Sequence, residues 1–466
     1  YRPCPIIRQT VRSGGNINYM VHYSSMLVAL TVAGSDSIGG AGLEADLKAF
    51  ASLGIHGACA VTAITSQNTQ GVSAIFPVPP RHVLSQLDAI LSDVRISSAK
   101  TGMLYSAEIA RTVAGRLAEE AFPIVVDPVM VAGVGDSLHK RDLIKTLEDR
   151  LLPIATIVTP NRFEAEVLAG IAIKDWEDAK KACRVIGKMG PKAVLLKGGH
   201  FDGALATDLF FSKGRFNEIS SPRLEFHVHG GGCTLSSFVA GYLAKDKTLK
   251  EAVALAKERV FDSIALRNSI GRGIEVINPM ATVERDVARY SVLARLKEEV
   301  NHAKSLLTSS WLPEVGTNFV FALPGATGIE QVCGLEGRII SVGGEPAQCG
   351  CLDFGASKHV ATIVLTAMKF DPEMRSAINL RLSTDNLARL RSAGLSIGGF
   401  EREKEPKGRK TMEWGTAETI RALGFVPDVI FDKGGVGKEP MIRLLGKDPE
   451  DVLTKLRRVC DQVVER

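Results

Sequence analysis

Short apolar segments alternate with segments of helical spacing from Leu27 to about residue 265. The apolar segments are LVALTVA, ACAVTAI, PIVVDPV, TIVTP and KAVLLKG, and the helical ones cover about 43–53, 83–91, 106–118 and 175–188. This alternation predicts a mainly parallel sheet with helices on both faces, that is, a three-layer α/β/α domain. Ligands bind such sheets at the carboxyl ends of the strands, so functional residues are expected in the glycine-rich and polar turns there.

A change of pattern divides the chain into two predicted domains. The Asn278-Pro279 pair and the charged run that follows it mark the boundary, and the segments after it predict a smaller, mixed α/β domain. At roughly 100–200 residues per domain, the chain has room for both. We predict domains over 26–280 and 281–466, and we interpret residues 1–25, which lack periodicity, as a tail or vector-derived segment.

Charge and cysteine content argue against several classes of protein. The net charge of +5 suits anionic small molecules, and the sequence lacks the cluster of basic and aromatic residues that indicates nucleic-acid binding. Only Cys349 and Cys351 lie close together, without the repeated C-x-x-C pairs of zinc sites, which fits reduced thiols in the cytoplasm. No apolar run is long enough to span a membrane. We expect a cytoplasmic homodimer with small-molecule partners and no nucleic-acid or membrane partner.

The most informative segment is HGGGCTLSSFVAGYLA, where three glycines precede a predicted helix that begins near Cys233 or Thr234. The backbone N–H groups of Gly230, Gly231 and Gly232 would join the free N–H groups of the helix in an anion hole. An anion hole suits the charge that develops on a transferring phosphoryl group. The alternative is a flexible turn before an amphipathic helix.

Two further motifs in the same region suit phosphate binding. In TPNRFEAE, Asn161 and Glu164 follow a strand at i, i+3 spacing and can point at one magnesium–phosphate cluster, whereas the alternative is a capping box. In KGGH, Lys197 ends a strand before two glycines, whereas the alternative is a solvated lysine beside a turn. The three motifs together, in one domain of alternating strands and helices, favour phosphoryl transfer.

Seven motifs between residue 27 and about residue 270 also carry a resemblance. They are AGSDSIGGAGLEADLKAF, SQNTQGV, KTGML, DPVM, TPNRFEAE, KGGH and GGGCTLSS. Together they closely resemble the hydroxymethylpyrimidine/phosphomethylpyrimidine kinase of the ribokinase-like superfamily. The resemblance implies phosphorylation of 4-amino-5-hydroxymethyl-2-methylpyrimidine to its monophosphate and then to its diphosphate, with ATP as co-substrate and Mg²⁺ as metal.

The resemblance also implies roles for individual residues. Around the pyrimidine it places Gly34, Ala41, Asp46, Gln67, Met103, Val129 and Cys233, and on the ATP–magnesium side it places Asn161, Glu164 and Lys197. Glu164 is expected to act on the metal indirectly. Glu44 departs from the family, which commonly has Gln at this position.

Cys233 stands where most ribokinase-like enzymes carry the Asp that activates the substrate hydroxyl. A thiol at a helix N-terminus can have a lowered pKa and act as a thiolate base. We therefore predict that Cys233 is catalytic, whereas the alternative is a small buried thiol that packs at the start of the helix.

Polar residues in turns of the second domain indicate anion binding. Arg338 precedes a predicted strand, and Ser357 and His359 open a predicted helix whose N-terminus would attract an anion. The alternatives are a surface salt bridge for Arg338 and a capping or core histidine for His359. Lys433 and Lys438 lie on a glycine-rich loop that does not satisfy the P-loop pattern.

From about residue 290 to the end, five segments closely match the ThiN-type thiamine-phosphate synthase domain. They are EGRIISVGG, FGASKHVA, LTAMKFDPEMRSAINLR, WGTAETI and PDVIFDKGGVGKEPMIRLLG. The resemblance implies that the pyrimidine diphosphate is joined to thiazole phosphate with release of pyrophosphate, and that Arg338 and His359 are essential. Charge and motif add Arg375, Asn379, Lys433 and Lys438 as phosphate-binding candidates, and Asp371 and Asp432 as either metal ligands or caps.

Two other functions remain as alternatives. The second domain resembles sensor domains that bind ligands in transcription regulators, but no helix-turn-helix pattern is visible and Arg338 and His359 are present. The first domain shares its fold with vitamin B6 kinases, but Gln67 and Met103 favour the aminopyrimidine.

Overall fold

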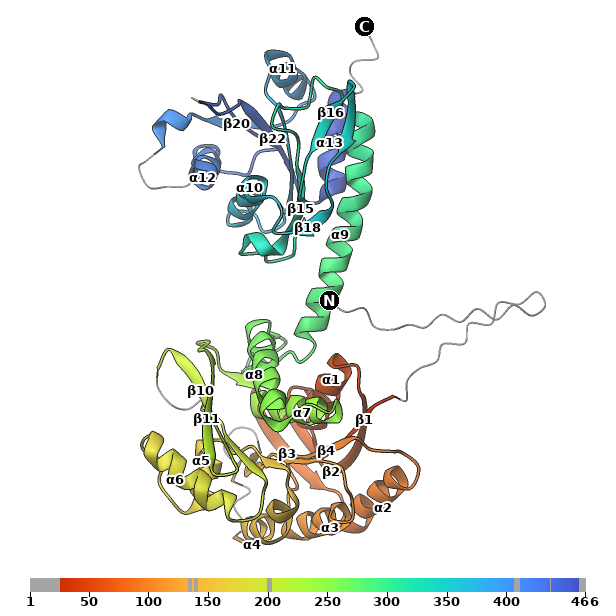
Figure 1. Ribbon diagram of the computed structural model, residues 1–466, viewed down its shortest axis with the longest axis vertical. Helices are drawn as coiled ribbons and strands as arrows, with labels where there is room; N and C mark the ends of the chain where they lie inside the picture. Colours follow the sequence, from red (N-terminus) through yellow and green to blue (C-terminus); the bar gives the residue numbers. More distant parts are fainter. Residues whose placement is uncertain are drawn as a thin grey trace, which may run out of the picture. The chain divides into compact units, whose positions relative to one another are not determined.

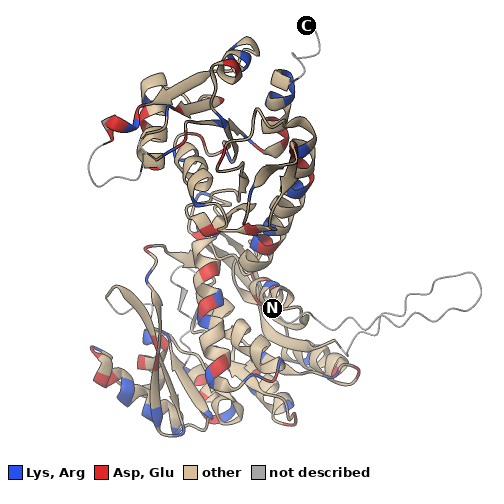
Figure 2. Cartoon of the chain, turned by 45° about the horizontal axis from the view of Figure 1, so that its top comes forward, with Lys and Arg blue, Asp and Glu red and all other residues tan. Residues whose placement is uncertain are grey.

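The computed structural model describes residues 26–132, 136–137, 141–198, 203–405, 411–435 and 437–460, so the predicted tail over 1–25 lies outside the described residues. The chain divides into two compact units at the boundary between Glu284 and Arg285, and each has its own sheet (Figure 1). Basic and acidic residues are interspersed over both units (Figure 2). None of the described helices combines the length and apolar character that crossing a bilayer requires.

The first unit is built on a nine-stranded sheet with the order β11-β10-β9-β8-β5-β4-β1-β2-β3. The strands are β1 (Val28–Ser35), β2 (His56–Asn68), β3 (Gly71–Pro77), β4 (Ser98–Thr101), β5 (Ile124–Val126), β8 (Ile157–Val158), β9 (Ala193–Leu196), β10 (Leu205–Ser212) and β11 (Arg215–Pro222). The strands from β9 to β2 in this order pair in parallel, and antiparallel strands flank them. The prediction of a mainly parallel sheet is therefore confirmed.

Helices cover both faces of this sheet. One layer contains α1 (Gly42–Ser52), α7 (Gly231–Ala244) and α8 (Leu249–Ala265), and the other contains α2 (Pro80–Leu91), α3 (Ala107–Leu117), α4 (Arg141–Thr146), α5 (Arg162–Ala169) and α6 (Trp176–Gly187) (Figure 1). Because successive strand residues point to opposite faces, β5 contributes to the hydrophobic core on each face of the sheet. Val125 packs with Phe238 of α7, and Val126 packs in the core that contains Val113 of α3.

The second unit contains a seven-stranded sheet with the order β18-β15-β14-β19-β22-β21-β20. The strands are β14 (Phe319–Ala322), β15 (Val332–Leu335), β18 (Leu352–Phe354), β19 (Ser376–Arg381), β20 (Ile397–Phe400), β21 (Val429–Asp432) and β22 (Met441–Gly446). Neighbouring strands are antiparallel except for the parallel pair β20 and β21. A hairpin of β16 (Ile339–Val342) and β17 (Glu345–Gln348) lies outside the sheet.

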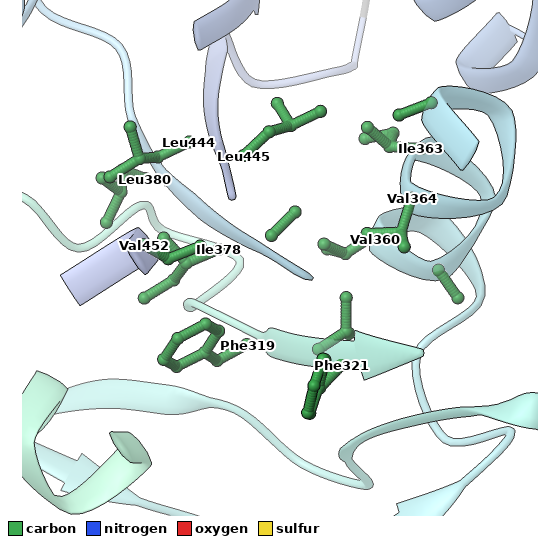
Figure 3. Close-up of a cluster of buried hydrophobic side chains, with 14 of the residues drawn as sticks. Phe319, Phe321, Val360, Ile363, Val364, Ile378, Leu380, Leu444, Leu445 and Val452 are labelled. Carbon is green, nitrogen blue, oxygen red and sulfur yellow. The ribbon is translucent and has the colours of Figure 1, made fainter. Parts of the chain in front are cut away.

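The core of the second unit surrounds the central strand β19. Its helices are α9 (Ala281–Leu306), α10 (Lys358–Met368), α11 (Thr384–Ser392), α12 (Thr411–Leu423) and α13 (Pro449–Cys460). Helices α10 and α13 both pack against β19, whose consecutive residues from 376 to 380 are all buried. Burial of consecutive residues requires cover on both faces, and Figure 3 shows Val364 and Val452 on either side of Ile378. The predicted mixed α/β architecture is confirmed.

Helix α9 crosses the boundary between the units, so its first turn belongs to the first unit and its later turns belong to the second. Asn278 Nδ2 donates a hydrogen bond of 2.7 Å to Glu284 in the first turn, whereas Leu296 and Val300 are buried in the core of the second unit.

If the chain is divided after Glu284, we expect both fragments to fold independently, because neither core is cut. Circular dichroism and thermal unfolding would check this, with one cooperative transition expected for each fragment. Molten fragments would contradict it.

Candidate active sites

A cavity of about 240 Å³ lies in the first unit, between the turn after β1, the β2–β3 hairpin and the start of α7. We call it the first cavity. Eleven of the residues predicted from the sequence line it, namely Gly34, Ala41, Gln67, Met103, Val129, Asn161, Glu164, Lys197, Gly230, Gly232 and Cys233. The structure thus brings residues from seven separate motifs to one place. Gly231 lies instead on a neighbouring cavity of about 260 Å³.

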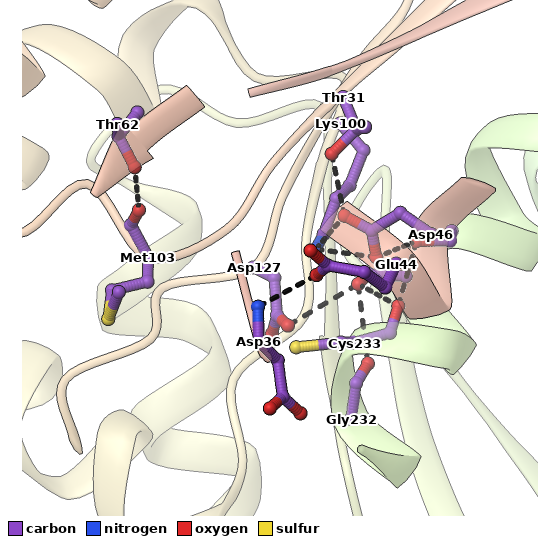
Figure 4. A network of polar contacts seen from close by, with 12 residues as sticks. Thr31, Asp36, Glu44, Asp46, Thr62, Lys100, Met103, Asp127, Gly232 and Cys233 are labelled. Carbon is purple, nitrogen blue, oxygen red and sulfur yellow. Dashed lines mark hydrogen bonds and ion pairs between the residues drawn. The ribbon is translucent and has the colours of Figure 1, made fainter. Parts of the chain in front are cut away.

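The structure does not place Asp46 on the first cavity, although the sequence predicted contact with the pyrimidine. Asp46 is fully buried and accepts hydrogen bonds from Lys100 at 2.9 and 3.0 Å, from Thr31 at 2.6 Å and from Ser237 at 2.6 Å (Figure 4). Burial alone would lower the pKa of Lys100, but the charge of Asp46 raises it above its usual value. Asp46 therefore holds a charged Lys100, which does line the cavity.

Lys197 connects two carboxylates in the wall of the first cavity. Its Nζ lies 2.9 Å from Asp127 Oδ1 and 3.9 Å from Glu164 Oε2. Burial raises the pKa of Glu164 to about 7, against the opposing charge of Lys197. Burial acts in the same direction on Asp127, but Lys197 and Lys100 together hold the pKa of Asp127 below its usual value. Of these two carboxylates, Asp127 thus has a lowered pKa and Glu164 titrates near neutral pH.

Asn161 and Glu164 form the capping box that was the alternative to a phosphate site. Asn161 Oδ1 accepts from the backbone N–H of Glu164 at 2.9 Å, and Glu164 Oε2 accepts from the backbone N–H of Asn161 at 2.8 Å. Both residues also line the first cavity. The capping box therefore fixes the Glu164 carboxylate at the cavity wall, so the two interpretations describe the same arrangement.

Helix α7 begins at Gly231, so the predicted start near Cys233 was wrong. Gly230 caps the helix with φ 91°, a left-handed conformation that favours glycine, and Gly231 and Gly232 then continue as helix. A Cβ on Gly230 would lie 1.7 Å from the carbonyl oxygen of Gly40. The glycines therefore allow the backbone N–H groups of the first helical turn to approach the cavity closely.

The pKa of Cys233 differs from the sequence-based expectation of a lowered value. Burial raises the pKa of the Cys233 thiol to about 11, although the charge of Lys100 lowers it. The pair with Asp46 offsets much of the charge of Lys100. The thiol is therefore protonated near neutral pH, and the position at the helix N-terminus does not outweigh burial.

Four residues that the sequence analysis did not single out belong to the site: Asp36, Lys100, Asp127 and His229. Asp36 accepts hydrogen bonds from the backbone N–H groups of Ile38, Gly40 and Ala41, at 2.8 to 3.1 Å. The Nε2 atom of His229 lies 2.9 Å from Asp36 and 2.7 Å from the amide of Gln67. All four lie within or beside the quoted motifs, so the sequence contained the signal, but their contacts required the fold.

A larger cavity of about 540 Å³ lies in the second unit, and we call it the second cavity. Four predicted residues line it, namely Arg338, His359, Asn379 and Lys438. Arg338 is held through its backbone, which donates to Cys349 at 3.1 Å and accepts from Cys349 at 2.8 Å. His359 is exposed in the first turn of α10. Both side chains are available to a ligand in this cavity.

The structure does not bring the remaining candidates to the second cavity. Arg375 stacks over Phe321 at 4.8 Å from the ring centroid, and Lys433 is exposed outside the lining. Asp371 accepts from the backbone N–H of Glu373 at 3.0 Å, as a cap does. No cluster of three or more metal-ligating side chains occurs among the described residues.

Asn379 lines the second cavity, but its side chain is already used within the protein. Its Oδ1 accepts from the backbone N–H of Asn318 at 2.7 Å, and its Nδ2 donates to the carbonyl oxygen of Gly316 at 3.1 Å. We therefore interpret Asn379 as a residue that fixes the cavity wall.

Comparison with known proteins identifies both units. The family model for phosphomethylpyrimidine kinase matches residues 36–278, and the model for thiamine-phosphate synthase ThiN matches residues 295–458. The bifunctional thiamine biosynthesis protein ThiDN of Methanocaldococcus jannaschii is 30% identical over 435 residues, which cover 92% of this chain and 97% of that protein. The chain belongs to this bifunctional kinase–synthase family. The resemblance found in the sequence is therefore confirmed for both the kinase and the synthase domain.

Two further relatives match the kinase domain. The thiamine biosynthesis bifunctional protein ThiED of Geobacter sulfurreducens is 46% identical over 257 residues, and the chain spans about half of its length, 52%. The structure of the pyridoxal kinase from Staphylococcus aureus in complex with AMP-PCP and pyridoxal has a TM-score of 0.52 and 34% identity, covering 56% of this chain and 95% of that chain. This likeness confirms the ribokinase-like fold of the first unit.

Proposed function

We propose that the kinase domain uses ATP to phosphorylate 4-amino-5-hydroxymethyl-2-methylpyrimidine twice, and that the synthase domain joins the resulting diphosphate to thiazole phosphate. The main support is that one chain matches both family models, over 36–278 and 295–458. The product of the first domain is then the substrate of the second. The test is to supply the purified chain with the alcohol, ATP and thiazole phosphate and to measure thiamine phosphate. Each domain is then assayed with its own substrates.

In the kinase domain, the start of α7 supplies N–H groups for the charge that develops on the transferring phosphoryl group. Lys197 adds a fixed positive charge, because its partner Asp127 holds it in place at 2.9 Å. The structure of the pyridoxal kinase with AMP-PCP supports ATP as the co-substrate. Cys233 lies in the same cavity and is our candidate for the group that removes the proton of the substrate alcohol.

Mg²⁺ is proposed for the kinase domain on the basis of its carboxylates. Asp127 and Glu164 both line the first cavity, and magnesium is commonly held by one or two carboxylates together with substrate phosphates. When bound, the metal would neutralise charge on the ATP phosphates. Glu164, with a pKa of about 7, provides a carboxylate that a cation can bring to its ionised form.

In the synthase domain, we propose that Arg338 and His359 stabilise the pyrophosphate that leaves. Both line the second cavity, and cationic groups stabilise negative charge best in a site that excludes water. A sensor domain would bind thiamine compounds at the same place without converting them to a product. Formation of thiamine phosphate from the pyrimidine diphosphate and thiazole phosphate therefore separates the two functions.

A vitamin B6 kinase is the second candidate for the first unit, because the pyridoxal kinase of S. aureus has a similar structure. The hydroxymethylpyrimidine/phosphomethylpyrimidine kinase of Synechococcus elongatus is 43% identical over 248 residues, compared with 34% for the pyridoxal kinase structure, which favours the pyrimidine. Parallel assays with pyridoxal and the pyrimidine alcohol would decide. The predicted homodimer stays a prediction, and light scattering of the full chain would test it.

A further inference from the structure

Two arginines in the synthase domain share one buried carboxylate. Asp432, at the end of β21, is fully buried and accepts from Arg402 Nε at 2.5 Å and Arg402 Nη2 at 3.1 Å. It also accepts from Arg443 Nη1 on the adjacent strand β22. Arg402 and Arg443 line the second cavity, whereas Asp432 does not. We call these three residues the arginine cluster.

The charges of the arginine cluster do not balance, because one carboxylate faces two guanidinium groups. Arg443 is only 4% exposed, and the one hydrogen-bond partner of its Nη2 atom among the described residues is the thioether sulfur of Met412, at 3.6 Å. Burial holds the pKa of Arg443 below its usual value, against the charge of Asp432. A buried cation with an unused donor is unfavourable unless a ligand supplies an acceptor. An anion in the cavity could accept hydrogen bonds from the side of the arginine cluster that does not face Asp432.

The other ionisable side chains that line the second cavity are also mainly basic. Four other cationic or titratable side chains line it: Arg338, Lys358, His359 and Lys438. Among the described lining residues, the one carboxylate belongs to Glu439. Its two oxygens already accept from the backbone N–H groups of Glu314, at 2.9 Å, and Val315, at 3.2 Å. The cavity thus suits a ligand with several negative charges.

We propose that Arg402 and Arg443, held in position by Asp432, bind the diphosphate group of the pyrimidine substrate and retain the pyrophosphate as it leaves. This inference rests on the proposed function of the synthase domain. A planar guanidinium can bind two phosphate oxygens at once, which a lysine cannot. The cluster offers two such groups side by side, which matches two linked phosphates better than one phosphate monoester.

The bond changes in the reaction explain why this position needs fixed positive charge. The bond between the pyrimidine methylene carbon and the diphosphate oxygen breaks, and its electron pair stays on the oxygen. The lone pair of the thiazole nitrogen then forms the new carbon–nitrogen bond, so no proton is transferred. Negative charge accumulates only on the pyrophosphate, where preorganised cations lower the barrier most.

The test is a calorimetric titration of the full chain with inorganic pyrophosphate, comparing wild type with Arg402→Gln and Arg443→Lys. Arg443→Lys keeps a positive charge against Asp432 but removes the planar fork. We expect each variant to bind pyrophosphate about 10- to 100-fold more weakly, the usual effect of losing hydrogen bonds to a charged group. Lys433→Gln is the matched control, because it removes a charge beside Asp432 but outside the cavity. Its affinity for pyrophosphate should equal that of wild type.

Any pyrophosphate bound by the kinase domain is common to all four proteins, so only differences between them report on the cluster. Near-UV circular dichroism of each variant confirms that the synthase domain is folded. Unchanged pyrophosphate affinity in both arginine variants would overturn the proposal. So would an increase in KM for thiazole phosphate alone, because that would assign the cluster to the other substrate.

Failure of the proposed function would look different from failure of the subsite. If the wild-type chain binds pyrophosphate through the cluster but forms no thiamine phosphate, the proposed synthase activity is contradicted and the proposed subsite is supported. If wild type, Arg402→Gln and Arg443→Lys all make thiamine phosphate with equal KM and kcat, the proposed function is supported and the proposed subsite is contradicted.

Discussion

Replacing Cys233 by alanine is expected to slow phosphorylation of the pyrimidine alcohol by about 10²–10⁴-fold, the usual range for loss of a general base. The nucleophile in this first step is a neutral hydroxyl whose proton must leave, and Cys233 lies in the first cavity beside the proposed anion hole. In the second step the nucleophile is a phosphate oxygen, which is already ionised near neutral pH, so the second step should lose much less. Two assays, one started from the alcohol and one from the monophosphate, measure this.

The pKa of Cys233 gives the first step a characteristic pH dependence. Burial raises this pKa to about 11, so the thiolate is a minor species near neutral pH and its fraction grows about tenfold per pH unit. The rate of the first step should therefore rise with pH across the range from about 6 to 9. The second step should level off above about pH 7, because phosphate monoesters lose their second proton near pH 6. Cys233→Ala should remove the slope of the first step.

Two control variants separate a base from a packing residue. Cys59→Ala removes another partly buried thiol of the kinase domain that does not line the first cavity, and it should leave both steps unchanged. Lys197→Ala should impair both steps, because charge on the transferring group must be stabilised in each. Equal losses in both steps for Cys233→Ala would mean that the thiol acts through packing or the anion hole.

Arg338→Ala and His359→Ala are each expected to reduce thiamine phosphate synthesis by about 10²–10³-fold, the scale seen when one charge-stabilising donor is removed. Both kinase steps should keep their rates, since these residues belong to the other unit. Truncating Arg338 leaves its backbone hydrogen bonds to Cys349 intact, so a folding defect is not expected. The measurement is the rate of synthesis from the pyrimidine diphosphate and thiazole phosphate.

Lys433→Ala serves as the control for these two variants, because it removes an exposed charge of the same domain outside the second cavity. It should retain wild-type synthesis. Near-normal synthesis by both Arg338→Ala and His359→Ala would contradict the roles assigned to these residues, whatever the kinase activity.

The sequence predicted the fold well, and eleven of the residues that it proposed for the kinase site line one cavity, because both depend on local patterns. Alternation of strands and helices determines a parallel sheet, and the turns after its strands meet at one edge, so motifs such as TPNRFEAE and KGGH come together without knowledge of their contacts. Side-chain direction is a different matter. Asp46 does not line the first cavity but bonds to Lys100, a residue 54 positions further along the chain, and nothing in the local pattern shows this.

Fewer of the residues proposed for the synthase site line one cavity, because the contacts around that cavity join residues on different strands. Arg375 and Lys433 were proposed from charge and motif, and neither of these distinguishes a cavity wall from a solvated surface. The sequence analysis did not single out Arg402 or Arg443, because their contacts with Asp432 join residues that are 30 and 11 positions apart along the chain. The register of β21 and β22, which pairs Asp432 with Met441, brings Arg443 within reach of that carboxylate. Register of this kind is set by the whole sheet.

The close approach of Gly230 to Gly40 determines which parts of the kinase site are open to redesign. Any side chain at Gly230 would collide with main-chain atoms that have no alternative position. Only glycine therefore fits at this position, where we propose that the phosphoryl group is stabilised. Gly34 is different, because a methyl group there would clash with the flexible end of Met103, at 2.3 Å, and would meet Ala63 only at an ordinary contact distance of 3.5 Å. An engineer who wishes to change the accepted ring should therefore begin at Gly34 and Met103, where side chains can adjust and the machinery for phosphate is left untouched.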